Sequence, residues 1–237
     1  MRITRVFTMM VVLCLAVSAF ADNIYNINFV RADTHWTDAY RYGQGVVGEA
    51  DDYWNLMNRN LNQSNPGTSG VLIYDLLDAS GNASSVKLDR TTVTTTGSLN
   101  TATPTNFVFE DYWSAANVAQ TITIRGLDDS KTYDIYIYSQ RDNSGAPFAR
   151  KIRTTIGGVT LTPVSSAWYS TYVLNENYVE FDDLQSSSGN IAITFQSTDT
   201  GSAPINAIQI VEIPEPATMA LLGIGGAIVL IRKKNMR

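Results

Sequence analysis

The chain has one Cys and one His among its 237 residues, and only 16% of the residues are charged. A single Cys excludes an intramolecular disulfide and a zinc site built from several Cys residues. The single His35 excludes multi-His metal sites and leaves any His-dependent catalysis to one residue. Acidic residues outnumber basic ones by 22 to 17, so nucleic acid and anionic lipid headgroups are poor partners.

The first 21 residues predict a secretory signal peptide, because a positively charged start precedes a short apolar run. Ala19 and Ala21 frame a small-x-small cleavage pattern, so the mature chain would begin at Asp22. An uncleaved anchor helix is the alternative. The lone Cys14 lies inside the apolar run and would be removed with the signal, which suits an oxidising export compartment.

The C-terminus repeats this organisation in reverse order. A Pro-Glu-Pro triplet precedes the apolar residues 217–231, and a basic cluster follows. As a helix, this apolar segment spans roughly 22 Å, short of the roughly 30 Å hydrocarbon core. Ile213 and the long basic side chains could extend its reach. We therefore expect one transmembrane helix in the inner membrane, with the basic cluster on the cytoplasmic side and the preceding domain outside. The residues that define the pattern are Pro214, Glu215, Pro216, Arg232, Lys233 and Lys234.

This tail closely resembles the PEP-CTERM sorting signal of bacteria, over about the last 24 residues. The resemblance implies that an exosortase, a membrane-embedded transpeptidase-like enzyme, recognises residues 214–216 and cuts near them. It also implies that the basic cluster at residues 232–234 stops transfer. Proteins with this signal are exported, often together with extracellular polysaccharide. A plain C-terminal anchor is the alternative.

Residues 22–213 predict one all-β domain with 11 basic and 21 acidic residues, a net charge of about −10. Short segments of alternating hydrophobicity, separated by Gly, Asn, Asp and Ser turns, predict ten or eleven strands. So many short strands favour an antiparallel β-sandwich of the jelly-roll type. The predicted strands are 25–29, 71–77, 86–96, 107–113, 121–125, 133–138, 152–156, 159–161, 179–181, 191–195 and 206–211.

Several local patterns sharpen this prediction. The apolar run 71–77 favours a central strand, and residues 51–61 are the one candidate for a turn or two of helix. Gly157-Gly158 predicts a tight hairpin. The spacing from Leu127 to Tyr133 is that of a tyrosine corner, in which the hydroxyl bonds the backbone just upstream.

Three segments, GLDDSKTYDIYIY, YVEFDDLQSSSGNIAITFQS and INAIQIVEI, resemble the galactose-binding-like jelly rolls. The resemblance covers about half of the domain. It implies carbohydrate affinity, and in some members structural calcium, without identifying the residues that contact a sugar.

Aromatic residues gather early in the domain and predict a sugar site, because sugar rings pack their C–H faces on aromatic planes. The strongest candidates are Trp36 and Trp54, with Asp33 and Arg41 as partners for sugar hydroxyls. Core or edge packing of these tryptophans is the alternative. The cluster comprises Trp36, Tyr40, Tyr42, Tyr53 and Trp54.

A calcium site is predicted from Glu49, Asp51 and Asp52, which place three carboxylates in one loop, although without EF-hand spacing. The alternative is a solvated acidic turn. No cofactor is expected, apart from structural calcium, which the acidic composition allows.

No catalytic residue is predicted. His35 lies among carboxylates, but no G-x-S-x-G motif supplies a nucleophile for it. Paired carboxylates such as Asp128-Asp129 could serve a glycosidase only at defined separations. We therefore expect an exported, non-catalytic surface or matrix protein, tethered to the inner membrane during transit and able to bind carbohydrate. A purely structural envelope protein and a polysaccharide-active enzyme are the alternatives.

Overall fold

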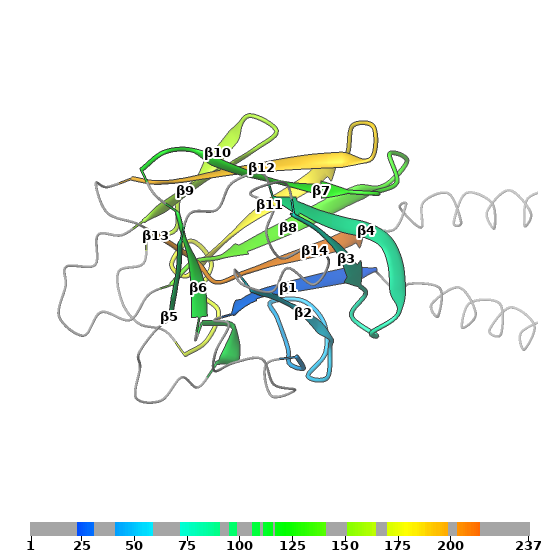
Figure 1. Ribbon diagram of the computed structural model, residues 1–237, viewed down its shortest axis with the longest axis horizontal. Helices are drawn as coiled ribbons and strands as arrows, with labels where there is room; N and C mark the ends of the chain where they lie inside the picture. The colour runs from blue at the N-terminus through cyan, green and yellow to red at the C-terminus, as the bar shows by residue number, and fades with distance from the viewer. Residues whose placement is uncertain are drawn as a thin grey trace, which may run out of the picture.

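Two large β-sheets lie face to face in the computed structural model of the chain (Figure 1). The β-sandwich predicted from the sequence is therefore confirmed, and it is of the jelly-roll type. Within the described ranges, the helical elements amount to the short 3-10 turn η2 (Phe107–Phe109). The structure describes residues 23–30, 41–58, 72–90, 95–98, 106–109, 111–115, 117–140, 151–164, 170–198 and 203–213.

The strands form three sheets. The five-stranded sheet has the order β11 (Tyr178–Gln185), β8 (Thr132–Tyr138), β14 (Ala207–Ile213), β1 (Ile24–Val30) and β2 (Trp54–Asn58). The six-stranded sheet has the order β10 (Val159–Leu161), β9 (Ile152–Ile156), β12 (Asn190–Ser197), β7 (Gln120–Arg125), β4 (Ala83–Arg90) and β3 (Leu72–Leu77). The small sheet has the order β13 (Ala203–Ile205), β6 (Asp111–Ala115) and β5 (Thr95–Ser98).

Strand β8 shows how alternation creates two cores. Tyr133, Ile135 and Ile137 point into the main core between the two large sheets. Tyr136 and Tyr138 point to the opposite face and belong to a second core. The division into two faces agrees with the sequence pattern, but the outward face is also buried. That second core lies on the outer side of the five-stranded sheet, where Val46, Val47 and η2 cover it.

The first and last strands of the domain are neighbours. β1 and β14 pair antiparallel, with Ile24 opposite Val211. Beyond this pair, the backbone N–H of Glu212 donates to the carbonyl of Asn23 over 2.8 Å, and the Asn23 side chain donates to the Glu212 carboxylate over 3.1 Å. The two ends of the domain therefore leave the sheet side by side.

Two local predictions were wrong. The run 71–77 is not central, because β3 lies at the edge of its sheet, where Asp75 is exposed and pairs with Lys87. The described part of the segment 51–61 is not helical, because Trp54–Asn58 forms β2, and residues 59–61 lie outside the described residues. β2 runs parallel to β1, which is an exception to the antiparallel pattern. The long connection between the two strands allows this parallel pairing. Its apolar residues Trp54, Leu56 and Met57 are buried by the strands and loops around it.

Two other local predictions are confirmed. Gly157 and Gly158 both have positive φ and join β9 to β10 in a tight hairpin. Tyr133 forms the tyrosine corner: its hydroxyl accepts from the Asp128 N–H over 2.8 Å and donates to the Asp128 carbonyl over 3.2 Å. Because Tyr133 is 1% exposed, its ring is also part of the main core.

We expect Tyr133→Phe to lower the free energy of unfolding by about 1–2 kcal/mol, because the Asp128 N–H loses a buried acceptor. Urea denaturation measures this change. The matched control is Tyr25→Phe, since the Tyr25 hydroxyl makes no hydrogen bond within the described residues. Equal losses in the two variants would contradict a special role for the corner.

Candidate functional site

A covering loop, residues 41–53, crosses the outer face of the five-stranded sheet. The loop is fastened by Gln209, a fully buried residue of β14. The Gln209 side chain accepts from the Val47 N–H over 3.1 Å and donates to the Val47 carbonyl over 2.8 Å. The Val46 N–H donates to the Tyr138 hydroxyl over 2.8 Å. A Cβ on Gly45 would lie 2.5 Å from the Gln209 amide nitrogen, so glycine permits this close approach.

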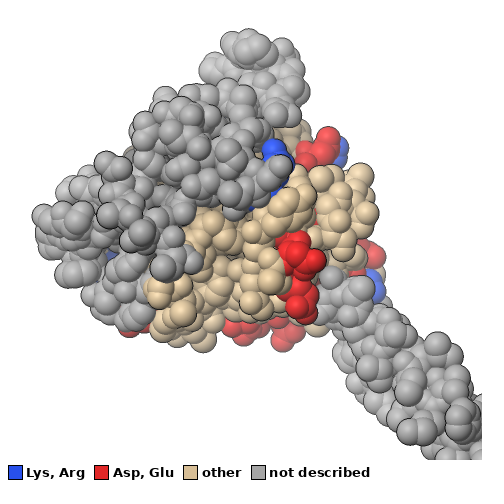
Figure 2. Space-filling model, turned by 90° about the horizontal axis from the view of Figure 1, so that it is seen from below, with Lys and Arg blue, Asp and Glu red and all other residues tan. Residues whose placement is uncertain are grey.

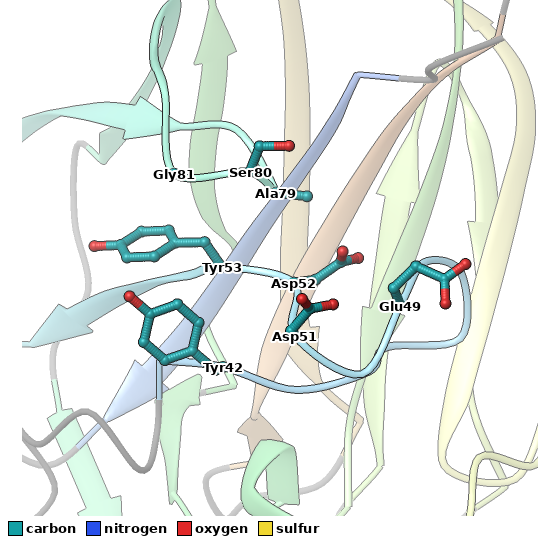
Figure 3. A pocket seen from close by; sticks show the side chains of 8 residues that line it. All are labelled: Tyr42, Glu49, Asp51, Asp52, Tyr53, Ala79, Ser80 and Gly81. Carbon is teal, nitrogen blue, oxygen red and sulfur yellow. The ribbon is translucent and has the colours of Figure 1, made fainter. Parts of the chain in front are cut away.

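A cavity of about 420 Å³ opens between the covering loop and the turn that connects β3 to β4 (Figure 3). Two tyrosine rings form one part of its wall, with centroids 5.8 Å apart and planes at 78°. Tyr42 is 53% exposed, and the Tyr53 hydroxyl accepts from the Arg41 guanidinium over 2.7 Å. The lining residues are Tyr42, Glu49, Asp51, Asp52, Tyr53, Ala79, Ser80 and Gly81.

The cavity carries three carboxylates. Glu49 and Asp51 are exposed, whereas one Asp52 oxygen, Oδ2, is buried without a hydrogen-bond partner within the described residues. Burial raises the pKa of Asp52, and repulsion by Asp51 and Glu49 adds to the rise, against hydrogen bonds from the Glu49 backbone and the Asn26 side chain. The Asp52 carboxylate lies against Gly48, which has a φ of 103° and no space for a Cβ.

The structure corrects the prediction that Trp54 contacts a sugar. Trp54 is 0% exposed, its ring lies edge-on to Phe107 and Tyr138, and its indole N–H donates to the Gly43 carbonyl over 2.7 Å. The alternative, core packing, is the role that the structure gives it, because the covering loop closes over this strand. Trp36 and Asp33 lie outside the described residues.

Other residues of the predicted sugar site do meet at the cavity. Arg41 lies beside it through its bond to Tyr53, and Tyr42 and Tyr53 from the aromatic cluster line it. The turn of Ser80 and Gly81 was missed, because it lies far along the chain and carries no aromatic or charged signal.

The predicted calcium ligands lie in one turn but are not preassembled. Within the described residues, one group of three potential metal ligands has its oxygens within 4.8 Å of one another, and it is Asp134, Glu180 and Asp182. Glu49, Asp51 and Asp52 do not form such a group. Calcium binding at these three residues stays a prediction.

The neighbouring carboxylates of Asp134, Glu180 and Asp182 repel one another. Burial raises the pKa of Asp134 and of Glu180, and the charge of Asp182 adds to both shifts. A folded state with raised carboxyl pKa values binds protons more tightly than the unfolded chain does. These two groups therefore destabilise the fold at neutral pH, and the penalty disappears as pH falls through the raised values toward the ordinary 3.8 and 4.5.

We expect Asp182→Asn to raise Tm at pH 7, because it removes part of this repulsion, and the gain to shrink toward about pH 4. Thermal denaturation across this pH range measures the effect. The control is Asp75→Asn, which removes an exposed carboxylate from the other large sheet and with it the 2.7 Å ion pair to Lys87. An equal rise in both variants would show a general charge effect instead of a local one.

On the side viewed in Figure 2, most of the described surface is uncharged, and its charged part consists of several acidic patches with few basic side chains. Within the described ranges, no helix has the length and apolar character needed to cross a membrane. The predicted signal peptide, residues 1–21, the predicted membrane segment, residues 217–231, and the sorting residues all lie outside these ranges.

Comparison with known proteins identifies the tail. Residues 212–234 match the family described as the PEP-CTERM protein-sorting motif, as the sequence pattern predicted. The chain therefore carries a sorting signal of exported proteins. No curated protein matches the chain.

Several solved structures are similar to the described domain at low identity. They include a family 35 carbohydrate binding module from Clostridium thermocellum, with 17% identity over 60% of this chain and 97% of that one and a TM-score of 0.32. Another is the CBM36-1 domain of a multidomain xylanase from the hindgut metagenome of Trinervitermes trinervoides, with 16% identity over 51% of this chain and 87% of that one and a TM-score of 0.31. Sequence identities and TM-scores this low give no basis for assigning the ligand or the role of these proteins to this chain.

Proposed function

We propose that this protein is an exported, non-catalytic component of the cell surface or extracellular matrix that binds carbohydrate in the cavity beside the covering loop. The sorting motif supports export. The cavity, with its exposed Tyr42 ring beside carboxylates, is the observation that carries the binding proposal.

The cavity has the chemistry of a sugar site. Its volume of about 420 Å³ lies in the range of small-ligand pockets. The exposed Tyr42 ring offers an apolar plane to the C–H face of a pyranose, while Glu49, Asp51 and Ser80 offer oxygens to its hydroxyls. The hydrogen bond from Arg41 orients the Tyr53 hydroxyl in this part of the wall.

The arrangement of the carboxylates favours binding over catalysis. A glycosidase needs an acid that reaches the glycosidic oxygen and a second carboxylate at a defined distance. Asp52 has a raised pKa, but its Oδ2 is buried against Gly48 instead of facing solvent. Glu49 and Asp51 lie on an exposed turn of the covering loop.

We expect Tyr42→Ala to weaken binding to a glycan at least about 10-fold, equivalent to about 1.4 kcal/mol, because the stacking surface is lost. The measurement is a glycan array followed by titration calorimetry with the full-length protein in mild detergent. Leu174→Ala is the control, since Leu174 is 46% exposed and does not line the cavity.

Three results would contradict the proposal. Absence of any glycan binding would favour the purely structural alternative. Binding that is unchanged in Tyr42→Ala would place the site elsewhere. Release of reducing sugar from a bound polysaccharide, lost when one carboxylate is replaced, would favour the enzyme alternative.

The sorting motif makes a second prediction, which concerns processing. We expect the released protein to lack residues 217–231 and the basic cluster after them, because exosortase-type cleavage near residues 214–216 removes them. Intact-mass measurement of the released protein tests this. Replacing Pro214 and Pro216 together by Ala should leave the protein uncut in the membrane fraction, and released protein that retains the tail would contradict the proposal.

A further inference from the structure

The cavity is strongly one-sided in charge. Three of its eight lining residues are acidic, and no basic residue is among them. The neighbouring Arg41 guanidinium is engaged with the Tyr53 hydroxyl. Because the domain itself carries a net charge of about −10, the field around the cavity has the same sign as the field within it.

Asp52 adds to this negative charge. The residue lines the cavity, and its Oδ2 is buried against Gly48 without a hydrogen-bond partner within the described residues. An ammonium group has three donors and a positive charge, so it compensates such a cluster better than a hydroxyl group does. A ligand carboxylate or sulfate would add repulsion instead.

The cavity also separates its two kinds of surface. Figure 3 shows the Tyr42 and Tyr53 rings at one side and the carboxylates of Asp51, Asp52 and Glu49 at the other. A pyranose ring seated on Tyr42 would therefore direct its substituents toward carboxylates. An ammonium group near a tyrosine ring also gains from the ring's electron-rich face.

We propose that the cavity selects saccharides with free, protonated amino groups, such as oligomers of glucosamine, over neutral and anionic saccharides. This inference rests on the proposed function, because it names the ligand class of the same cavity. The aromatic surface holds any pyranose, and the carboxylates provide the selectivity.

Three hexasaccharides test the selectivity: glucosamine, N-acetylglucosamine with the same linkage, and galacturonate. The full-length protein in mild detergent is titrated at about pH 5.5, where the amine is charged. We expect the glucosamine hexamer to bind at least about 10-fold more tightly than the acetylated hexamer, and the galacturonate hexamer to bind most weakly. The preference should shrink at high salt, because the contribution is electrostatic.

The two exposed carboxylates of the cavity provide the test variant. We expect Glu49→Gln combined with Asp51→Asn to abolish most of the preference, because binding of the glucosamine hexamer falls much more than binding of the acetylated hexamer. The control for charge elsewhere on the domain is Asp182→Asn, which removes one carboxylate from the acidic group on β8 and β11, away from the cavity. Tyr42→Ala should weaken binding of both hexamers alike.

The outcomes separate the two proposals. Equal or tighter binding of the acetylated or galacturonate hexamer, lost in Tyr42→Ala, would overturn the selectivity and leave carbohydrate binding standing. A preference that falls as much in Asp182→Asn as in the cavity variant would also overturn the selectivity of the cavity. General attraction between the acidic domain and the positively charged hexamer would then explain the preference. Failure of all three hexamers and of the glycan array would overturn both proposals.

Discussion

The side chain of Gln209 is the constraint on which the outer half of this molecule depends. It sits fully buried in a central strand, where a polar group must find partners or destabilise the fold. Its partners are the Val47 backbone, the Tyr138 hydroxyl and the Asn26 side chain. Two of these hydrogen bonds are made to the covering loop. The bonds that satisfy the buried amide of Gln209 are therefore the same bonds that position the loop.

The loop in turn makes the second core and the cavity possible. Once Val46 and Val47 are fixed on the sheet, Trp54 and Tyr138 are sealed from water beneath them. The same loop carries Tyr42 and the three carboxylates to the edge of the sheet. Gly45 and Gly48 allow this path, because side chains at either position would meet Gln209 or Asp52. Core packing and the proposed carbohydrate binding therefore depend on one segment, and a change that loosens the loop would affect both.

The alternation of apolar residues was enough to predict the all-β sandwich and most strands, since period-2 patterns report burial directly. The alternation pattern failed where the burial of a strand depends on segments distant in the sequence. Trp54–Asn58 alternates poorly because both of its faces are covered, and the apolar β3 is an edge strand whose exposed Asp75 was the overlooked signal. Two members of the aromatic cluster, Tyr42 and Tyr53, line the cavity, and a sugar site there stays a prediction. Which of the cluster's members faces solvent could not be predicted, because that depends on Gln209, more than 150 residues away.

The pairing of Asn23 with Glu212 bears on how the proposed processing would release the domain. The predicted signal peptide ends at residue 21, and the matched sorting motif begins at residue 212, within the last strand. If both predicted segments enter the membrane, the domain is attached to it at two neighbouring points. Cleavage of the predicted signal peptide would then leave the domain attached through its C-terminal segment alone. The proposed exosortase-type cleavage near residues 214–216 would have to take place directly beside the folded sheet, because β14 ends at Ile213.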